Sequence, residues 1–176
     1  MKKRIRVLVV DDHAMVRMGL NEAIAAEPDM QLAGEAADGF EAIEQYQKNQ
    51  PHVVLMDYQM PNLDGVQATA QLRKKFPEAS IVLLSIREGQ EDIWRAHQAG
   101  VRGYLPKSAP MNEVLAAVRQ VHAGKDYFPP EITAKIKLRA GQSGLTSREA
   151  DVLRLIVGGK CNKEISTLLD LSLIHI

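Results

Sequence analysis

The sequence predicts an α/β fold, with a five-stranded parallel and doubly wound sheet, followed by a small all-α region. Short apolar runs alternate with segments of helical periodicity as far as residue 123, which is typical of repeated strand–helix units. The strand runs are apolar at almost every position, as expected for parallel strands that are buried on both faces. A purely helical pattern begins at Thr146.

Each predicted element has its own signal. The strands are short apolar runs at residues 5–10, 31–36, 53–56, 80–85 and 103–105. Between and after these runs, apolar side chains recur every three or four residues, which predicts five helices. The helices contain Val16, Leu20, Ala23 and Ile24 in the first, Ala42, Ile43 and Tyr46 in the second, residues 66–75 in the third, Trp94 in the fourth, and Met111, Val114, Leu115, Val118 and Val121 in the fifth.

The domain boundaries follow from the point where this rhythm ends. Pro129 and Pro130 lie among glycines and basic residues, which predicts a linker with a helical turn near Ile132. Thr146 and Glu149 have the spacing of a capping box, so a new helix is expected to start there. The predicted division is a first domain at residues 4–123, a linker at 124–143 and a partial helical domain at 144–176.

Composition excludes several classes of protein. The chain carries 22 basic and 22 acidic side chains, so its net charge of +0 provides no whole-molecule attraction to nucleic acid or membrane. The single cysteine, Cys161, excludes an internal disulfide and fits a reducing compartment. No apolar run is long enough to span a bilayer. These observations predict a cytoplasmic protein without a membrane partner.

Acidic residues follow two of the predicted strands. Asp11 and Asp12 end the first apolar run and Asp57 ends the third. Ligands of open parallel sheets bind beyond the carboxyl ends of the strands, and the expected strand order places these two ends side by side. Each acid alone is typical of a turn or a helix cap. For the three acids together, a Mg²⁺ site is as well supported as a set of turn or cap residues. The ligands of such a site would be Asp12, Asp57 and the backbone carbonyl of Gln59, with Asp11 acting through water.

Two further strand ends add a hydroxyl and an ammonium group. Ser85 closes the fourth predicted strand and Lys107 follows the fifth. Alone, such a serine is usually a helix cap and such a lysine is usually a solvated surface group. With the acids they form a set suited to phosphoryl transfer: a carboxylate nucleophile at Asp57, a metal ion, a hydrogen-bond donor and a fixed cation.

These motifs resemble the receiver domain of two-component response regulators, which has a flavodoxin-like, CheY-like fold. The matching segments are "VLVVDDH" at 7–13, "VVLMDYQMPNLDG" at 53–65, "VLLS" at 82–85 and "GYLPK" at 103–107. The glycine that ends the second segment, Gly65, is expected to have a backbone φ that other residues resist. Ser108 lies where many receivers have proline, so we expect altered loop detail at this point but not a lost site.

The resemblance implies a role for each residue of the set. Asp57 would accept a phosphoryl group from a sensor histidine kinase, while Asp11 and Asp12 would hold Mg²⁺. Ser85 and Lys107 would contact the phosphoryl oxygens. The remaining role concerns Tyr104, which would be an aromatic switch that turns inward when Ser85 moves toward the phosphoryl group.

The segment "LTSREADVLRLIVGGKCNKEISTLLDLS" at 145–172 resembles the start of the LuxR-type helix-turn-helix domain of the NarL/FixJ class. This resemblance implies a transcription factor that binds DNA and dimerises on activation. Arg148, Lys160 and Lys163 are candidate phosphate contacts, although three scattered basic residues are more typical of ordinary surface charge. The family's recognition helix should begin after Ser172, and we expect this chain to lack it.

Two other functions compete with a DNA-binding regulator. The first is a receiver that acts without DNA, as a phosphate sink or a protein-interaction switch, which fits an incomplete DNA reader but leaves "LTSREADVL" unexplained. The second is a Mg²⁺-dependent phosphatase with an aspartate nucleophile. Such enzymes often carry a second acid two residues after the nucleophile, where this chain has Gln59. We therefore expect a regulator and not an enzyme.

Overall fold

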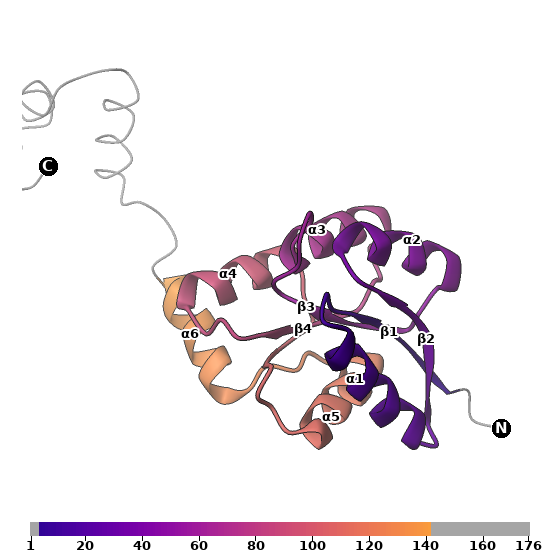
Figure 1. The fold of residues 1–176 in the computed structure, drawn as a ribbon. Helices are drawn as coiled ribbons and strands as arrows, with labels where there is room; N and C mark the ends of the chain where they lie inside the picture. Colours follow the sequence, from indigo (N-terminus) through magenta and orange to yellow (C-terminus); the bar gives the residue numbers. More distant parts are fainter. Residues whose placement is uncertain (1–3, 142–176) are drawn as a thin grey trace, which may run out of the picture. The chain divides into compact units, whose positions relative to one another are not determined.

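A five-stranded parallel sheet is the centre of the structure, a computed structural model that describes residues 4–141 (Figure 1). Helices follow the strands in strict alternation, and a sixth helix comes after the last pair. Along the chain the elements are β1 (Ile5–Val10), α1 (Ala14–Ala26), β2 (Met30–Ala36), α2 (Gly39–Asn49), β3 (Val53–Asp57), α3 (Gly65–Lys75), β4 (Ile81–Ser85), α4 (Gln90–Ala99), β5 (Gly103–Pro106), α5 (Met111–His122) and α6 (Pro130–Gly141).

The strand order β2-β1-β3-β4-β5 sets the position of the site. The chain builds outward from β1 to β2 and then returns to the other side of β1 with β3, so the direction of winding reverses between β1 and β3. Val10 pairs with Met56 in this ladder, which brings the next residues, Asp11 and Asp57, to one edge of the sheet. Such a reversal point is where open α/β sheets bind ligands.

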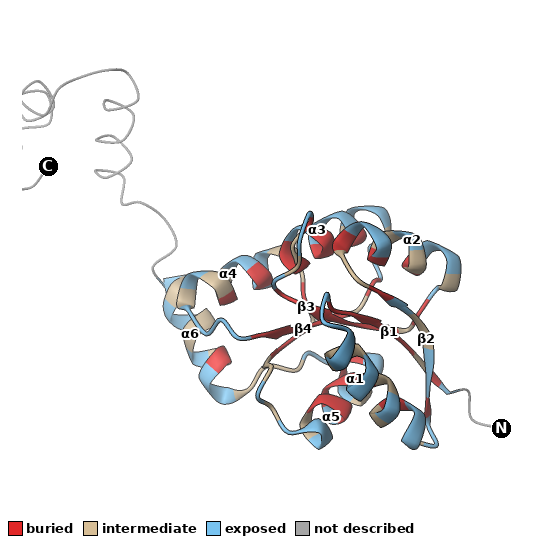
Figure 2. Cartoon of the chain, viewed as in Figure 1, coloured by how far each residue is buried: buried red, intermediate tan, exposed pale blue. Residues whose placement is uncertain are grey.

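Helices cover both faces of the sheet. The helices α1 and α5 lie on one face, and α2, α3 and α4 lie on the other (Figures 1 and 2). Each face has its own apolar cluster: one contains Leu20, Ile24 and Val118, and the other contains Ala42, Leu72 and Ile93. All residues of β3 and β4 are buried, which explains why these runs lack the polar alternation of a one-sided sheet.

The outer strands of the sheet are irregular. The pairing of β1 with β2 shifts register between Val7 and Leu8. On the opposite edge, Tyr127 forms an isolated parallel bridge with Gly103 of β5. Its backbone N–H donates to the carbonyl of Arg102 at 2.8 Å, and its own carbonyl accepts from the N–H of Tyr104 at 3.2 Å. The segment before α6 is therefore attached to the sheet.

The sequence predicts this architecture well between residues 5 and 122. The five strands, the five helices and the parallel doubly wound arrangement are confirmed. The prolines and glycines after Gly124 predict a linker with one helical turn, whereas the structure has a helix of 12 residues, α6. This helix forms because Ile132, only 5% exposed, packs into the apolar cluster beside α4. Tertiary packing therefore overrides the weak local signal.

The remaining predicted boundaries are only partly covered by the structure. The helical domain expected at 144–176 lies outside the described residues, so the division into residues 4–123, 124–143 and 144–176 stays a prediction. As far as Arg139, α6 belongs to the same compact unit as the sheet. Among residues 4–141, no helix is long and apolar enough to cross a membrane.

The packing of α6 generates a stability prediction. Replacing Ile132 by alanine should lower the free energy of unfolding by about 2–4 kcal/mol, because the change leaves a cavity in the core. Leu138 is the matched control, since it lies on the same helix and is 62% exposed. Leu138→Ala should change the free energy by less than about 0.5 kcal/mol. Urea unfolding followed by circular dichroism measures both, and equal effects would show that α6 is not packed as described.

Candidate functional site

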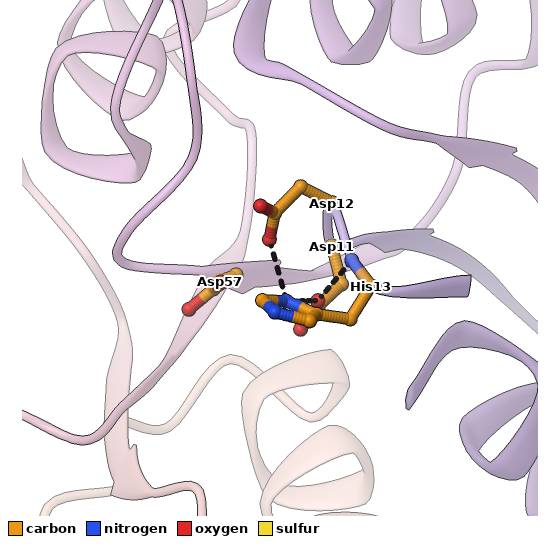
Figure 3. Close-up of side chains that lie close together, drawn as sticks. All are labelled: Asp11, Asp12, His13 and Asp57. Carbon is orange, nitrogen blue, oxygen red and sulfur yellow. Dashed lines mark hydrogen bonds and ion pairs between the residues drawn. The ribbon is translucent and has the colours of Figure 1, made fainter. Parts of the chain in front are cut away.

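Three acids and a histidine meet at the carboxyl edge of β1 and β3 (Figure 3). Asp11 and Asp57 are buried, with 1% and 3% of their surface exposed, whereas Asp12 and His13 are exposed. One ligand atom from each of the four residues lies within 4.8 Å of the others. The sequence prediction that Asp11, Asp12 and Asp57 converge is therefore confirmed by the geometry.

Backbone N–H groups fix one oxygen of each buried acid. The N–H of His13 donates to Oδ1 of Asp11 at 2.9 Å, and the N–H of Gln59 donates to Oδ1 of Asp57 at 3.2 Å. Arg17, from α1, donates from Nη1 to the backbone carbonyl of Asp11 at 2.6 Å. These bonds leave the Oδ2 atoms of the two acids for other partners.

Lys107 bridges the two buried acids. Its Nζ lies 2.8 Å from Oδ2 of Asp11 and 2.7 Å from Oδ2 of Asp57. The lysine is held in place because its backbone N–H donates to the carbonyl of Ser85 at 2.8 Å, just beyond the end of β5. One ammonium group thus compensates part of the negative charge that the two strand ends bring together.

Burial and the neighbouring charges together set the pKa of Asp57 and of Lys107. Burial raises the pKa of Asp57, and the neighbouring charge of Asp11 raises it further, while Lys107 and the Gln59 N–H hold it back. For Lys107, burial alone would lower the pKa, but the carboxylates of Asp11 and Asp57 outweigh burial and raise it. The lysine is therefore a permanent cation, beside a carboxylate that is more basic than usual.

The donor set fits a hard divalent cation. Carboxylate and carbonyl oxygens are the ligands that Mg²⁺ prefers. Oδ2 of Asp11 is buried and accepts no hydrogen bond of good geometry, although Lys107 lies close to it. Three carboxylates facing a single ammonium leave an excess of negative charge, which a cation would compensate. Gln59 immediately follows the strand end and lines the same cavity as Asp57.

The site opens to solvent through a cavity of about 330 Å³. Its walls combine charged and apolar side chains, because Val16 of α1 and the strongly exposed Ile86 line it together with Asp57 and Lys107. Asp57 lines this cavity, and Figure 3 shows its side chain beside the group formed by Asp11, Asp12 and His13. A group of phosphoryl size can therefore approach Asp57 from outside the sheet.

Ser85 and Tyr104 meet at the backbone of Arg87. The Ser85 hydroxyl is fully buried and accepts a hydrogen bond from the N–H of Arg87 at 2.8 Å. Tyr104 is 1% exposed, and its hydroxyl donates to the carbonyl of Arg87 at 2.6 Å. The structure thus joins both predicted switch residues to Arg87 by hydrogen bonds, and it places the Tyr104 side chain already inside the protein.

Several residues near the site were missed by sequence reasoning. His13 contacts Asp12 through Nδ1 at 2.8 Å, and its only sequence signal is its place directly after the acidic pair. Tyr58 donates from its hydroxyl to Oδ1 of Asp92 at 3.0 Å, and Arg87 lies 3.7 Å from the same oxygen. Burial and the Asp92 contact raise the pKa of Tyr58 to about 12. No spacing rule links these residues, since the fold alone brings them together.

Gly65 corrects one detail of the sequence analysis. The expected unusual φ is wrong, because Gly65 is absent from the positive-φ residues of the described chain. Its requirement is one of space: a Cβ atom at this position would lie 2.1 Å from the backbone carbonyl oxygen of Asp57. The start of α3 therefore packs directly on the backbone of the acid that the site is built around.

Comparison with known proteins identifies the family. Residues 7–119, more than half of the chain, match the response regulator receiver domain. The response regulator protein VraR of Staphylococcus aureus is 36% identical over 168 residues, which cover 93% of this chain and 80% of that protein. This chain belongs to the response regulator family. In receiver domains, an acidic pocket such as that of Asp11, Asp12 and Asp57 binds Mg²⁺.

Solved structures agree with this assignment of a response regulator. A two-component response regulator of the LuxR family from Aurantimonas sp. SI85-9A1 is 31% identical, with a TM-score of 0.73 over 78% of this chain and 99% of that one. The response regulator domain of Thermotoga maritima CheB is 34% identical, with a TM-score of 0.64 over 69% of this chain and 98% of that one. The predicted CheY-like receiver fold is confirmed.

The second family match concerns the end of the sequence. Residues 143–174 match the luxR family of bacterial regulatory proteins. The predicted combination of a receiver with a LuxR-type DNA-binding domain is therefore confirmed for this response regulator. Arg148, Lys160 and Lys163 lie outside the described residues, as does the expected place of the recognition helix after Ser172.

The close contact at Gly65 predicts the effect of a single methyl group. Gly65→Ala should lower the free energy of unfolding of the response regulator by about 1–3 kcal/mol, because α3 must move away from the Asp57 carbonyl. The matched control is Gly19→Ala in α1, where nothing lies within 4 Å of the added atom. That change should stabilise the protein by up to about 1 kcal/mol, because alanine favours helix. Thermal or urea unfolding measures the stability of both variants. An unchanged stability of Gly65→Ala would contradict the packing described here.

Proposed function

We propose that Asp57 is the phosphoacceptor of this response regulator and receives its phosphoryl group from a sensor histidine kinase. The observation that carries the proposal is the position of Asp57 at the sheet edge, 2.7 Å from the Lys107 ammonium and beside Asp11 and Asp12. Of the described residues, this set alone combines a carboxylate cluster suited to a metal ion with a fixed cation and an open cavity.

The chemistry follows from the charges of the residues around Asp57. A carboxylate oxygen of Asp57 attacks the phosphorus atom, a new O–P bond forms, and the P–N bond to the kinase histidine breaks. Burial keeps the Asp57 carboxylate basic, and Lys107 keeps it ionised and compensates the charge of the phosphoryl oxygens. The backbone N–H of Gln59 holds Oδ1 of Asp57 at 3.2 Å and so orients the nucleophile.

The acidic pocket supplies the place for the metal ion. Asp12, Asp57 and the Gln59 carbonyl would hold Mg²⁺ directly, and Asp11 would hold it through water, in keeping with the oxygen donors that this ion prefers. When bound, Mg²⁺ neutralises negative charge on the transferring phosphoryl group. His13 is better suited to orienting Asp12 than to binding Mg²⁺, because it offers nitrogen in place of oxygen.

Ser85 and Tyr104 are proposed to change position when Asp57 is phosphorylated. Phosphorylation replaces the Asp57 carboxylate with a group of about −2 charge that carries three phosphoryl acceptor oxygens. The Ser85 hydroxyl would donate to one of these oxygens. The Tyr104 side chain would shift together with Ser85, because both hydroxyls are hydrogen-bonded to the backbone of Arg87. The receiver needs only a small free-energy gap between two arrangements for this change to act as a switch.

The output of the switch is proposed to be transcription control through the LuxR-type region. DNA is the partner, Arg148, Lys160 and Lys163 are the candidate phosphate contacts, and a homodimer is the expected active form. We propose a cytoplasmic location, where the kinase and DNA are both accessible. The protein is proposed to turn over no substrate, and p-nitrophenyl phosphate hydrolysis above the rate of self-dephosphorylation would contradict this.

Labelling at one residue tests the phosphoacceptor assignment. Wild-type protein with acetyl phosphate and Mg²⁺ should gain one phosphoryl group by intact mass, and Asp57→Asn should gain none, because an amide is not a nucleophile. Asp126→Asn is the matched control, since this exposed acid pairs with Arg102 before β5, at the other end of the strand from the site. An Asp57→Asn protein that labels as fast as wild type would refute the assignment.

A gel-shift experiment tests the output. The full-length protein, with a complete LuxR-type domain, should bind promoter DNA more tightly when phosphorylated than when unphosphorylated, because phosphorylation is expected to favour the dimer and thereby pair two DNA-binding regions. A receiver that acts without DNA predicts no shift in either state. Salt titration provides the control, since phosphate contacts weaken as salt rises.

A further inference from the structure

Helix α6 is attached to the face formed by α4 and β5 in two different ways. Apolar packing holds its start and its middle: Ile132 lies in the core, and Phe128, just before the helix, and Ile136, near its middle, pack partly buried against the same cluster. The residues just before it are fixed by the bridge between Tyr127 and Gly103. The start of α6 is therefore part of the folded receiver.

The second half of α6 combines the apolar contact of Ile136 with polar contacts to residues 88–94. Lys135 donates from Nζ to the backbone carbonyl of Glu88 at 2.7 Å. Arg139 donates from Nε to Oε2 of Glu91 at 3.1 Å, and its guanidinium lies 5.9 Å from the centre of the Trp94 ring. All three partners belong to residues 88–94, the loop after β4 and the first half of α4. Solvent-exposed contacts of this kind are individually weak and easily exchanged.

The same loop begins at the phosphorylation site. Ser85 ends β4, Arg87 is bonded to the Ser85 hydroxyl and to the Tyr104 hydroxyl, and Glu88 follows with the carbonyl that Lys135 contacts. Four consecutive residues, 85–88, therefore carry the predicted switch hydroxyl at one end and an α6 contact at the other.

This loop must move if Ser85 is to contact a phosphoryl group. Ser85 is 0% exposed, so no water-sized group in the cavity beside Asp57 can touch it in the arrangement described. Movement of Ser85 toward the cavity would pull on the N–H of Arg87 and displace the Glu88 carbonyl. The start of α6 would stay in place, since its attachments to β5 and the core do not involve this loop.

We propose that the second half of α6, residues 135–139, is a latch whose docking on α4 is coupled to the state of Asp57. This inference rests on the proposed phosphorylation of Asp57. Phosphorylation displaces the Glu88 carbonyl and loosens Lys135 and Arg139, while Ile132 keeps the helix attached. The docked latch in turn restrains the loop, so Ser85 reaches the incoming phosphoryl group less readily and phosphorylation of Asp57 is slower. The latch thus transmits the state of the site toward the residues that follow α6.

Amide hydrogen exchange of the full chain tests the first half of the proposal. Phosphorylation with acetyl phosphate and Mg²⁺ should increase exchange across residues 135–139 several-fold and leave the segment around Ile132 much less changed. Asp57→Asn in the same mixture should show no increase. Unchanged exchange at residues 135–139, in protein that is phosphorylated on Asp57, would overturn the latch and leave the phosphoacceptor assignment intact.

A pair of variants tests the reciprocal effect. The double variant Lys135→Ala with Arg139→Gln should be labelled by acetyl phosphate about 2- to 5-fold faster than wild type, within the range that coupled networks carry. Lys137→Ala is the matched control, because this lysine lies exposed on the same helix between the two. It should label at the wild-type rate.

The outcomes separate the two proposals. Equal labelling rates for the double variant, the control and wild type would overturn the latch while Asp57 remains the phosphoacceptor. An increase of the same size in Lys137→Ala would also overturn it, because the effect would then come from loss of charge alone. Failure of wild type to label at Asp57 would overturn the proposed function and, with it, the latch.

Discussion

The two ion pairs of Lys107 are the interaction on which the site depends. The parallel sheet brings the carboxyl ends of β1 and β3 together, and with them two buried acids that repel each other. The ammonium of Lys107 lies 2.8 Å from Asp11 and 2.7 Å from Asp57, and its positive charge reduces the repulsion between the two carboxylates. The backbone N–H of the same lysine donates to the carbonyl of Ser85. Lys107 therefore connects the acids that follow β1 and β3 to the ends of β4 and β5.

A single geometric theme connects the response regulator fold to its chemistry. The residues of the site lie at the carboxyl end of a strand or just after it, where a buried element supports each of them beside the cavity. Rigid strands fix the acids and the lysine, whereas the loop after β4 is held to its neighbours by a few hydrogen bonds. The site therefore combines a fixed charge cluster with one adjustable segment, which is the arrangement a switch requires.

The sequence predicts those parts of this molecule that depend on local pattern or on strand order. Apolar runs located the strands, and the acids, Ser85 and Lys107 followed from the rule that strand ends share an edge. The steric role of Gly65 could not be predicted from the sequence, because it depends on how closely α3 approaches the Asp57 carbonyl. Helix α6 and the Tyr58–Asp92 contact were missed for the same reason: Ile132 and Asp92 find their partners only through tertiary packing.

The unequal edges of the sheet have a consequence for association between copies of the chain. Open strand edges invite backbone pairing with a neighbouring molecule. Here the bridge from Tyr127 occupies part of the β5 edge, and the register shift between Val7 and Leu8 distorts the β2 edge. In the part of the chain that the structure describes, both edges of the sheet are therefore irregular, which discourages association of two copies through added strands.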